Sequence, residues 1–263
     1  PRSTLFPYTT LFRSLITNCR AQVARVNGLS GFGTSSTGFK PICKKVDEVA
    51  MLEPNLVTRM WFEAHHHLVG QGGPLATVVA SNGLIVRQPA PDRFHALVDA
   101  IVGQQISTKA AGAIRTRIGV ELGPGPLIDT LVTVDDSALR SCGLSGAKVR
   151  SIRDLVRRVR DGSIAMAAFD ATPDAEVRRA LTAVMGIGRW TADMFLLFAL
   201  CRPDVLPSTD LGIRVAVGRL LKLSSVAEPG QVERAAEEGG WHPFASAASL
   251  HLWRMLGGPD RTV

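Results

Sequence analysis

Apolar residues recur along most of the chain at the spacing of an amphipathic helix. Between residues 94 and 101 they fall at i, i+3, i+4 and i+7, which places them on one helix face. No convincing alternation of apolar and polar residues follows residue 90, so the pattern predicts an all-α fold with short loops. The other predicted helical faces lie in residues 149–159, 190–198 and 213–221, and from about Pro243 to Met255.

Two helix starts carry a polar signal. Ser107 is placed to cap a helix that runs to Ile118. Ser208 or Thr209 is placed to cap a later helix, which puts Asp210 in its first turn, where the helix dipole favours an ionised carboxylate. Such a carboxylate can stabilise a sugar cation of oxocarbenium character, although an acid there also simply favours the helix.

Residues 1–50 differ from the rest of the chain. Residues 1–14 show no helical period and resemble a translated sequencing adapter, and residues 27–41 are rich in Gly, Ser and Thr. We predict that residues 1–50 are a disordered or non-native lead segment and that residues 51–263 form the folded domain.

Composition narrows the class of protein. Hydrophobic residues make up 46% of the 263 and charged residues 20%, as in a soluble globular protein. The formal charge of +7 suits a polyanion, either a nucleic acid or an anionic membrane surface, and the longest apolar run, residues 194–201, is too short to span a bilayer. The four cysteines show no CxxC spacing, which argues against a zinc site, an iron–sulfur cluster or a disulfide scaffold and favours a reducing cytosol.

Two short turns between predicted helices are candidate contacts to a nucleic acid. Gly186 and Gly188 flank one aliphatic residue, and this spacing makes a tight turn that presents backbone N–H groups at a helix N-terminus, where phosphate binds. Gln104 and Gln105 are adjacent amides that can bind base edges or fill a space left in a duplex. A plain tight turn and a solvated loop are the alternatives for these two segments.

Charged and imidazole side chains offer two further candidates. His65, His66 and His67 are consecutive, so a helix points them in different directions and they make a poor site for one metal ion. Four arginines share one face of the helix predicted at 149–159 and could follow phosphates, although a solvated face is the alternative: Arg150, Arg153, Arg157 and Arg160.

The order of five motifs resembles the helix-hairpin-helix DNA glycosylases, and most closely the 3-methyladenine DNA glycosylase II family. The resemblance covers about residues 61–256. It is carried by AIVGQQIS at 100–107, GLSGAK at 143–148, MGIGRWTA at 185–192, RPDV at 202–205 with DLGI at 210–213, and WHPF at 241–244 with LHLWR at 250–254.

The resemblance implies two helical lobes with a DNA-binding cleft between them. One lobe is expected at about 55–102 together with 225–263, and the other at about 103–224. Asp210 corresponds to the catalytic aspartate and Gln105 to the side chain that enters the gap left by a flipped nucleotide. The implied base pocket is formed by Trp190, Met194, Leu211 and Trp253, and the implied phosphate contacts are Gly186, Gly188 and Arg189.

Two departures from the family pattern bear on activity. The closing motif usually carries an arginine before its serine, whereas this chain has Ala245 before Ser246, which leaves out a polar contact. Family members that also cut the strand carry a lysine nucleophile just after the hairpin, and Trp190 stands there instead. The resemblance also implies no metal held by side chains and no organic cofactor or iron–sulfur cluster, with Na⁺ or K⁺ on the hairpin backbone.

The expected protein is therefore a monofunctional glycosylase of base excision repair that releases alkylated purines such as 3-methyladenine. A glycosylase for deaminated or oxidised bases and a non-catalytic DNA-binding module are the alternatives. The expected partner is damaged double-stranded DNA rather than a membrane, and we expect a monomer in the bacterial cytosol, at the nucleoid.

Overall fold

The computed structural model describes residues 55–257, and the lead segment predicted for residues 1–50 lies outside them. Within the described range the chain forms twelve α-helices, two further helical turns and no strand, which confirms the all-α prediction. No helix in that range is long and apolar enough to cross a membrane. In chain order the elements are α3 (Leu56–Gly70), α4 (Gly73–Asn82), α5 (Arg93–Gly103), α6 (Thr108–Leu122), α7 (Leu127–Thr133), α8 (Asp136–Ser141), α9 (Gly146–Arg160), η1 (Met166–Ala168), α10 (Asp174–Thr182), α11 (Arg189–Met194), η2 (Phe195–Ala199), α12 (Leu211–Leu220), α13 (Pro229–Glu238) and α14 (Ala245–Met255).

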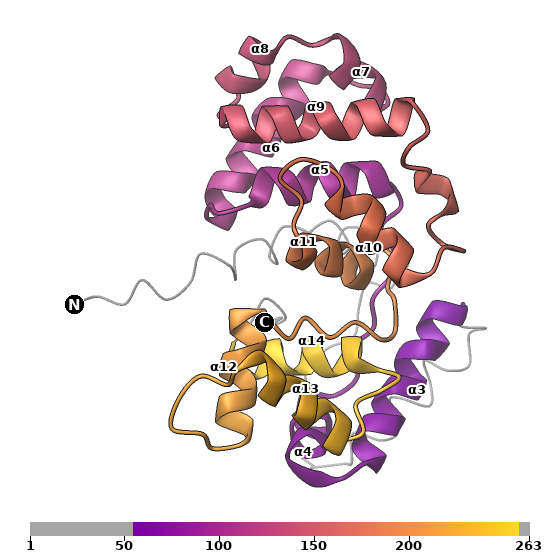
Figure 1. Ribbon diagram of the computed structural model, residues 1–263, viewed down its shortest axis with the longest axis vertical. Coiled ribbons are helices and arrows are strands. Elements are labelled where there is room, and N and C mark those ends of the chain that lie inside the picture. The colour runs from indigo at the N-terminus through magenta and orange to yellow at the C-terminus, as the bar shows by residue number, and fades with distance from the viewer. Residues whose placement is uncertain (1–54, 258–263) are drawn as a thin grey trace, which may run out of the picture.

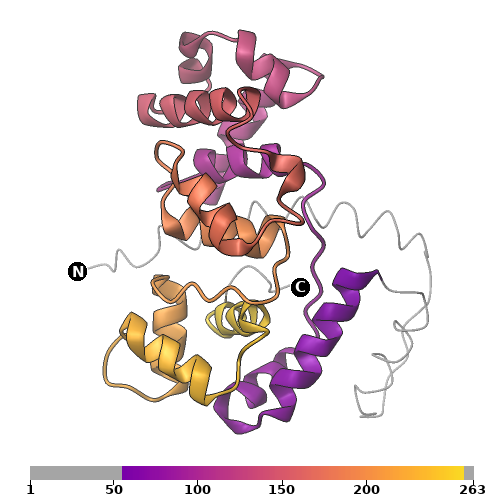
Figure 2. The same ribbon diagram turned by 45° about the vertical axis from the view of Figure 1, so that its right-hand side comes forward.

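The helices form two groups, which lie one above the other in both views (Figures 1 and 2). The lower lobe consists of α3, α4, α12, α13 and α14, and the upper lobe consists of α5 to α11 with η2. This grouping differs from the expected lobe boundaries. Helix α5 packs on α6, α9 and η2 and so belongs to the upper lobe, while α12 packs on α13 and α14 and so belongs to the lower lobe.

The predicted apolar faces become the core. All four apolar residues of the 94–101 face are buried in α5, and α9 buries one face against α5, α7 and α8 while its opposite face carries arginines. Helix α11 continues directly into η2, a wider π-helical turn, and every residue from Thr191 to Cys201 is buried. This buried segment holds the start of α11 firmly against the upper lobe.

Two connections, residues 83–92 and 200–210, join the lobes. The first connection contacts the residue that precedes the second one: the Ala90 N–H donates to the Ala199 carbonyl at 2.9 Å. The second connection is fixed on α14, where the Ser246 N–H donates to the Pro203 carbonyl at 3.0 Å and the Ser246 hydroxyl accepts from the Val205 N–H at 2.9 Å. The chain therefore reaches residue 210 along a defined path.

Candidate active site

Asp210 ends the second connection and begins α12. Only 4% of the residue is exposed, and its carboxylate caps the helix: Oδ1 accepts from the Ile213 N–H at 2.9 Å. The predicted cap, Ser208 or Thr209, is therefore wrong, and the Ser208 hydroxyl donates to Glu233 at 2.8 Å instead. The carboxylate is thus held at a helix N-terminus, where the dipole favours its negative charge.

Two tryptophans from different lobes bind this carboxylate. Trp190, in α11 of the upper lobe, donates from Nε1 to Asp210 Oδ2 at 2.8 Å. Trp253, in α14 of the lower lobe, donates from Nε1 to Asp210 Oδ1 at 2.9 Å. With the helix amide, three N–H donors occupy a group that can accept about four hydrogen bonds. Asp210 is therefore positioned by neutral donors at the junction of the two lobes.

The structure brings only part of the predicted base pocket to Asp210 by direct contact. Trp190 is half-buried and Trp253 is buried, and both touch the carboxylate through the nitrogen edge of the indole. Met194 is buried in the apolar core one turn after Trp190, and Leu211 is the half-buried first residue of α12. The base-pocket role of these four residues stays a prediction.

Two residues beside the pair formed by Asp210 and Trp253 were not predicted from the sequence as part of the site. A Cβ added at Gly212 would lie 3.0 Å from Asp210 Oδ1 and from Trp253 Nε1, so a side chain there would crowd the contact between the indole and the carboxylate. The Phe198 ring stacks on Trp253, with 5.9 Å between centroids and 30° between planes. The glycine could have been suspected from the Asp-Leu-Gly run, whereas nothing in the sequence pairs Phe198 with Trp253.

The hairpin turn, residues 185–188, lies between α10 and α11. Gly186 has a φ of +77°, and a Cβ there would lie 2.4 Å from the Ser151 hydroxyl oxygen, so both its conformation and its surroundings require glycine. Gly188 has an ordinary φ of −91°, and a Cβ there would meet nothing within 4 Å. Arg189 follows with 76% of its side chain exposed.

Asp154 of α9 anchors the hairpin turn. Its Oδ2 accepts from the Met185 N–H at 2.8 Å, and Arg157 and Arg158 donate to the same carboxylate. Burial by itself would raise the pKa of Asp154, but the hydrogen bonds from Met185, Arg158 and Arg157 outweigh it and lower the pKa to about 2. Ile187, 3% exposed, packs into the core from the same turn.

The predicted wedge lies beside the hairpin turn. Gln105 is exposed and has a φ of +56°, a left-handed conformation that is uncommon for a residue other than glycine. Its neighbour Gln104 turns inward, and its Nε2 donates to the Gly186 carbonyl at 3.0 Å. The bond between Gln104 and Gly186 couples the two turns, and Gln105 is left exposed beside them. Its role as a wedge stays a prediction.

The arginine face of α9 is largely engaged within the upper lobe. Arg153 donates to the backbone carbonyls of Leu131 and Val134 at the end of α7, and Arg157 donates to the aspartate one turn earlier. Among the described residues, only Arg150 of the four makes no such contact. Neither a phosphate-following stripe nor a solvated face describes Arg153, which holds α7 on α9.

Ala245 fills a tight position at the start of α14. The residue is fully buried, and its N–H donates to Asp204 Oδ1 at 3.2 Å. The next residue, Ser246, is equally buried against the second connection. The alanine side chain is therefore part of the packing between α14 and the second connection.

The three consecutive histidines occupy different surroundings. His67 Nε2 forms a 2.7 Å hydrogen bond with the Gly240 carbonyl. Burial lowers the pKa of His65, and burial together with His65 and Arg254 lowers the pKa of His251 to about 3. Within residues 55–257, no group of three or more His, Cys, Asp or Glu side chains is arranged to hold a metal ion.

The hairpin backbone offers carbonyl oxygens to a monovalent cation. The Gly186 carbonyl accepts from Gln104, and the Val184 carbonyl accepts from the Ile187 N–H at 3.1 Å. Each carbonyl keeps a second lone pair, and the binding of Na⁺ or K⁺ to this backbone stays a prediction.

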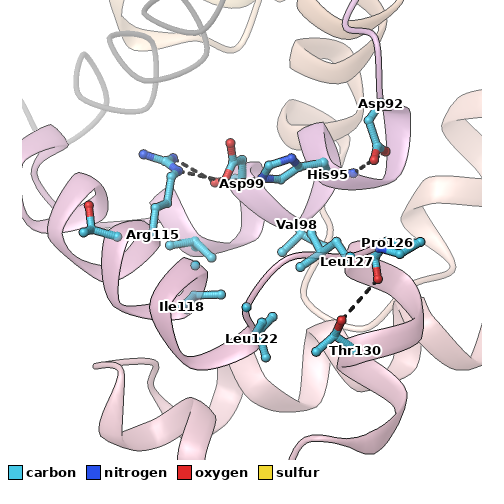
Figure 3. Close-up of a pocket in the computed structure, with 15 residues that line it drawn as sticks. Asp92, His95, Val98, Asp99, Arg115, Ile118, Leu122, Pro126, Leu127 and Thr130 are labelled. Atoms are coloured by element: carbon cyan, nitrogen blue, oxygen red, sulfur yellow. Dashed lines mark hydrogen bonds and ion pairs between the residues drawn. The ribbon is translucent and has the colours of Figure 1, made fainter.

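A separate pocket of about 430 Å³ lies in the upper lobe between α5, α6 and α7 (Figure 3). Its polar wall carries Asp99, which accepts from Arg115 Nε at 2.8 Å, and His95 Nε2 lies 3.9 Å from the same oxygen. None of the residues that line it belongs to the group around Asp210. This pocket is therefore distinct from the candidate active site.

The sequence pattern of the HhH-GPD superfamily of base excision DNA repair proteins matches residues 98–241, more than half of the chain. The match includes the wedge, the hairpin turn and Asp210. Together with the helical fold, it shows that the chain belongs to the HhH-GPD superfamily, and the helix-hairpin-helix resemblance is confirmed.

Among members of the superfamily, the chain is similar to several 3-methyladenine DNA glycosylases. DNA-3-methyladenine glycosylase 1 of Schizosaccharomyces pombe is 32% identical over 164 residues, which are 61% of this chain and 71% of the relative. The crystal structure of a DNA-3-methyladenine glycosidase from Bacillus halodurans is similar at a TM-score of 0.67 and 32% identity, and covers 73% of this chain and 88% of that one. The S. pombe 3-methyladenine DNA glycosylase in complex with abasic DNA has a TM-score of 0.66 and 29% identity, and covers 76% of this chain and all of that one.

Proposed function

We propose that this chain is a DNA glycosylase that flips alkylated purines, such as 3-methyladenine, out of duplex DNA and hydrolyses their N-glycosidic bond. The observation that carries the proposal is the buried Asp210 carboxylate, bound by one indole from each lobe. The names of the relatives support the same substrate class.

The chemistry requires little acid catalysis. Alkylation at N3 or N7 places a positive charge on the base, so the bond between C1′ and the base nitrogen breaks with its electron pair moving onto the base. The sugar is left as an oxocarbenium-like cation, which the negative charge of Asp210 stabilises. The carboxylate also orients or deprotonates the water whose oxygen then bonds to C1′.

The tryptophans have two tasks in this proposal. They hold Asp210 through their nitrogen edges, and they would offer aromatic surface to a flipped base. The Phe198 ring stacks on Trp253 and adds to the aromatic surface beside Asp210. A cationic base stacked on an indole gains a cation–π contribution of roughly 0.5–2 kcal/mol.

The hairpin turn and the wedge would hold the DNA while the base is out. The open side of Gly188 allows close approach of a phosphate to the start of α11, and Arg189 is exposed beside it. A monovalent cation bound to the hairpin carbonyls would add positive charge next to that phosphate. Gln105, exposed beside the turn, would fill the space that the flipped nucleotide leaves.

Absence of strand cleavage is part of the proposal. A glycosylase that also cuts the strand needs an amine nucleophile for a Schiff base, and Trp190 occupies the position after the hairpin where the family places that lysine. We also propose that the protein acts as a monomer at the bacterial nucleoid, where damaged chromosomal DNA is found.

A lesion panel tests the proposed function. Duplexes that each contain 3-methyladenine, 7-methylguanine, hypoxanthine or 8-oxoguanine are incubated with the protein, and the released base is measured by chromatography. We expect release of the methylated purines, with strand breaks only after alkali. Release confined to hypoxanthine or 8-oxoguanine would contradict the substrate class, breaks without alkali would contradict the monofunctional assignment, and DNA binding without release of any base would indicate a binding module.

A further inference from the structure

Arg87, in the first connection between the lobes, is an unusual arginine. Only 7% of it is exposed, and among the described residues its guanidinium makes no hydrogen bond or ion pair, with Nε buried and unpartnered. Its backbone is fixed, since the Arg87 carbonyl accepts from Trp61 Nε1 at 2.9 Å. Burial of a guanidinium is costly unless the group is paired or hydrogen-bonded, so the contacts that Arg87 does make need an explanation.

The guanidinium lies over an aromatic ring that leads to the active site. Arg87 Cζ is 4.9 Å from the centroid of the Phe198 ring, a cation–π geometry. The Phe198 ring in turn stacks on Trp253, which donates to the Asp210 carboxylate at 2.9 Å. Three contacts therefore connect the cation of Arg87 to the carboxylate.

The members of this ladder, Arg87, Phe198, Trp253 and Asp210, come from four separate parts of the chain. Arg87 lies in the first connection, Phe198 in the π-helical turn η2 at the end of the upper lobe, and Trp253 in α14 of the lower lobe. The ladder thus passes from one lobe to the other beside Asp210. Any rotation of Phe198 would change the surface against which Trp253 is held.

We propose that Arg87 is a positioning residue for the glycosylase reaction: it fixes Phe198, and through Phe198 it orients the Trp253 indole that holds Asp210. The inference rests on the proposed function. Arg87 acts through packing, because the Phe198 ring contacts both its guanidinium and the Trp253 indole. It needs no contact with DNA.

The test compares Arg87→Met, which keeps the stem and removes the guanidinium, with Arg87→Lys, which keeps the cation. Arg234→Met, on the exposed face of α13, is the matched control. Single-turnover release of 3-methyladenine should fall about tenfold in Arg87→Met, which corresponds to about 1.4 kcal/mol, recover partly in Arg87→Lys and stay unchanged in the control. Affinity for a duplex with an abasic analogue should change less than twofold.

A double-mutant cycle separates orientation from general destabilisation. In a Trp253→Phe background, Arg87→Met should cause no further loss of rate, because the indole that Arg87 orients is gone. Independent, multiplicative losses would overturn the proposal, as would a folded Arg87→Met variant with the wild-type rate. If Arg87→Met does not fold, Phe198→Leu replaces it, because this variant removes the ring between Arg87 and Trp253 and should cause the same loss of rate. A wild-type rate in Phe198→Leu would overturn the proposal.

Tryptophan fluorescence tests whether Arg87 orients Trp253 independently of any glycosylase activity. Arg87→Met should shift the emission of the protein without DNA, and the shift should vanish in the Trp253→Phe background. If the wild-type protein releases no base while this pattern holds, the proposed function fails and the ladder stands. If the emission of Arg87→Met matches that of wild type, the ladder fails whatever the activity.

Discussion

At the scale of single residues, the two glycines of the hairpin turn meet different demands. Gly186 has a positive φ and would strike Ser151 with any side chain, so the fold itself requires it. Gly188 has an ordinary backbone conformation and open space where a Cβ would stand. Nothing inside the described protein requires glycine at 188, and in the proposed function a phosphate that approaches the backbone from outside supplies the reason.

Substitution of these glycines should therefore separate folding from DNA binding. Gly188→Val should keep the melting temperature within about 2 °C, because its conformation suits a β-branched residue, and should weaken binding to damaged and undamaged duplex alike by tenfold or more. Gly186→Val should lower the melting temperature instead, since a side chain at positive φ costs about 1–2 kcal/mol before any clash. Thermal melts and fluorescence anisotropy provide the two readouts.

Gly70→Val is the matched control for this pair, because a Cβ at Gly70 also meets nothing within 4 Å but lies at the end of α3 in the lower lobe. Unchanged DNA affinity in a folded Gly188→Val protein would show that phosphate does not approach the turn closely.

At the scale of elements, the hairpin turn is held by a helix that is distant in sequence. Asp154 of α9 binds the Met185 amide, and Gln104 at the end of α5 binds the Gly186 carbonyl. The turn is thus anchored from both sides by side chains of the upper lobe. A turn held in this way can meet a phosphate without being ordered at the moment of binding, which lowers the entropic cost of the contact.

The Asp154 anchor should make stability depend on pH in an identifiable window. Because its folded pKa is about 2, below the ordinary 3.8, the carboxylate contributes stability that is fully present above about pH 4 and is lost as the pH falls through the folded value. Urea unfolding of wild type and Asp154→Asn should therefore differ most at pH 5 and above, and the difference should shrink toward pH 2.

Asp170→Asn serves as the control for Asp154, because Asp170 is a 67% exposed carboxylate in an ion pair with Arg93 and should contribute little. A difference between wild type and Asp154→Asn that is constant across the pH range would show that the charge of Asp154 does not anchor the turn.

The sequence pattern captured local features and missed those that join distant parts of the chain. Helical faces and the Ser107 cap depend on neighbouring residues, and the Ser107 hydroxyl does accept from the Ala110 N–H at 3.2 Å. Helix α6 nevertheless runs to Leu122 rather than Ile118, and Leu122 extends its apolar face one turn further against the core. The placement of α5 and α12 in their lobes depends on which surfaces meet, and periodicity contains no such information.

In the candidate site, too, the sequence indicates single residues but not the contacts between distant ones. Asp210 and Trp190 could be named from motifs, but their hydrogen bond spans 20 positions and the bond to Trp253 spans 43. The arginine spacing on α9 identified a shared face correctly, yet only the fold shows that Arg153 binds carbonyls at the end of α7.

At the scale of the whole molecule, two lobes meet at one carboxylate. The lower lobe supplies α12 and Trp253, the upper lobe supplies Trp190 and the hairpin turn, and Asp210 receives a hydrogen bond from each lobe. Within residues 55–257 two connections join the lobes, and the hydrogen bond from Trp190 to Asp210 fixes the upper lobe against the start of α12. This arrangement places the proposed chemistry where DNA gripped by one lobe can be contacted by the other.

The net charge of +7 should appear in the salt dependence of DNA binding. Each phosphate neutralised on duplex DNA releases about 0.9 counterions, so the logarithm of the affinity should fall linearly and steeply with the logarithm of the salt concentration. The slope should be nearly equal for damaged and undamaged duplex, since the proposed phosphate contacts do not read the base. A slope near zero would contradict an electrostatic grip.

The central claim is that Asp210, held by two indoles, supplies the charge that stabilises the sugar cation. Asp210→Asn keeps the shape of the side chain and removes that charge, and single-turnover release of 3-methyladenine from a methylated duplex measures the consequence directly. We expect the rate to fall by about 10²–10³, the usual effect of losing one preorganised electrostatic group, while binding to a duplex with an abasic analogue is retained. Release by Asp210→Asn at near the wild-type rate would reduce Asp210 to a helix cap and contradict the mechanism.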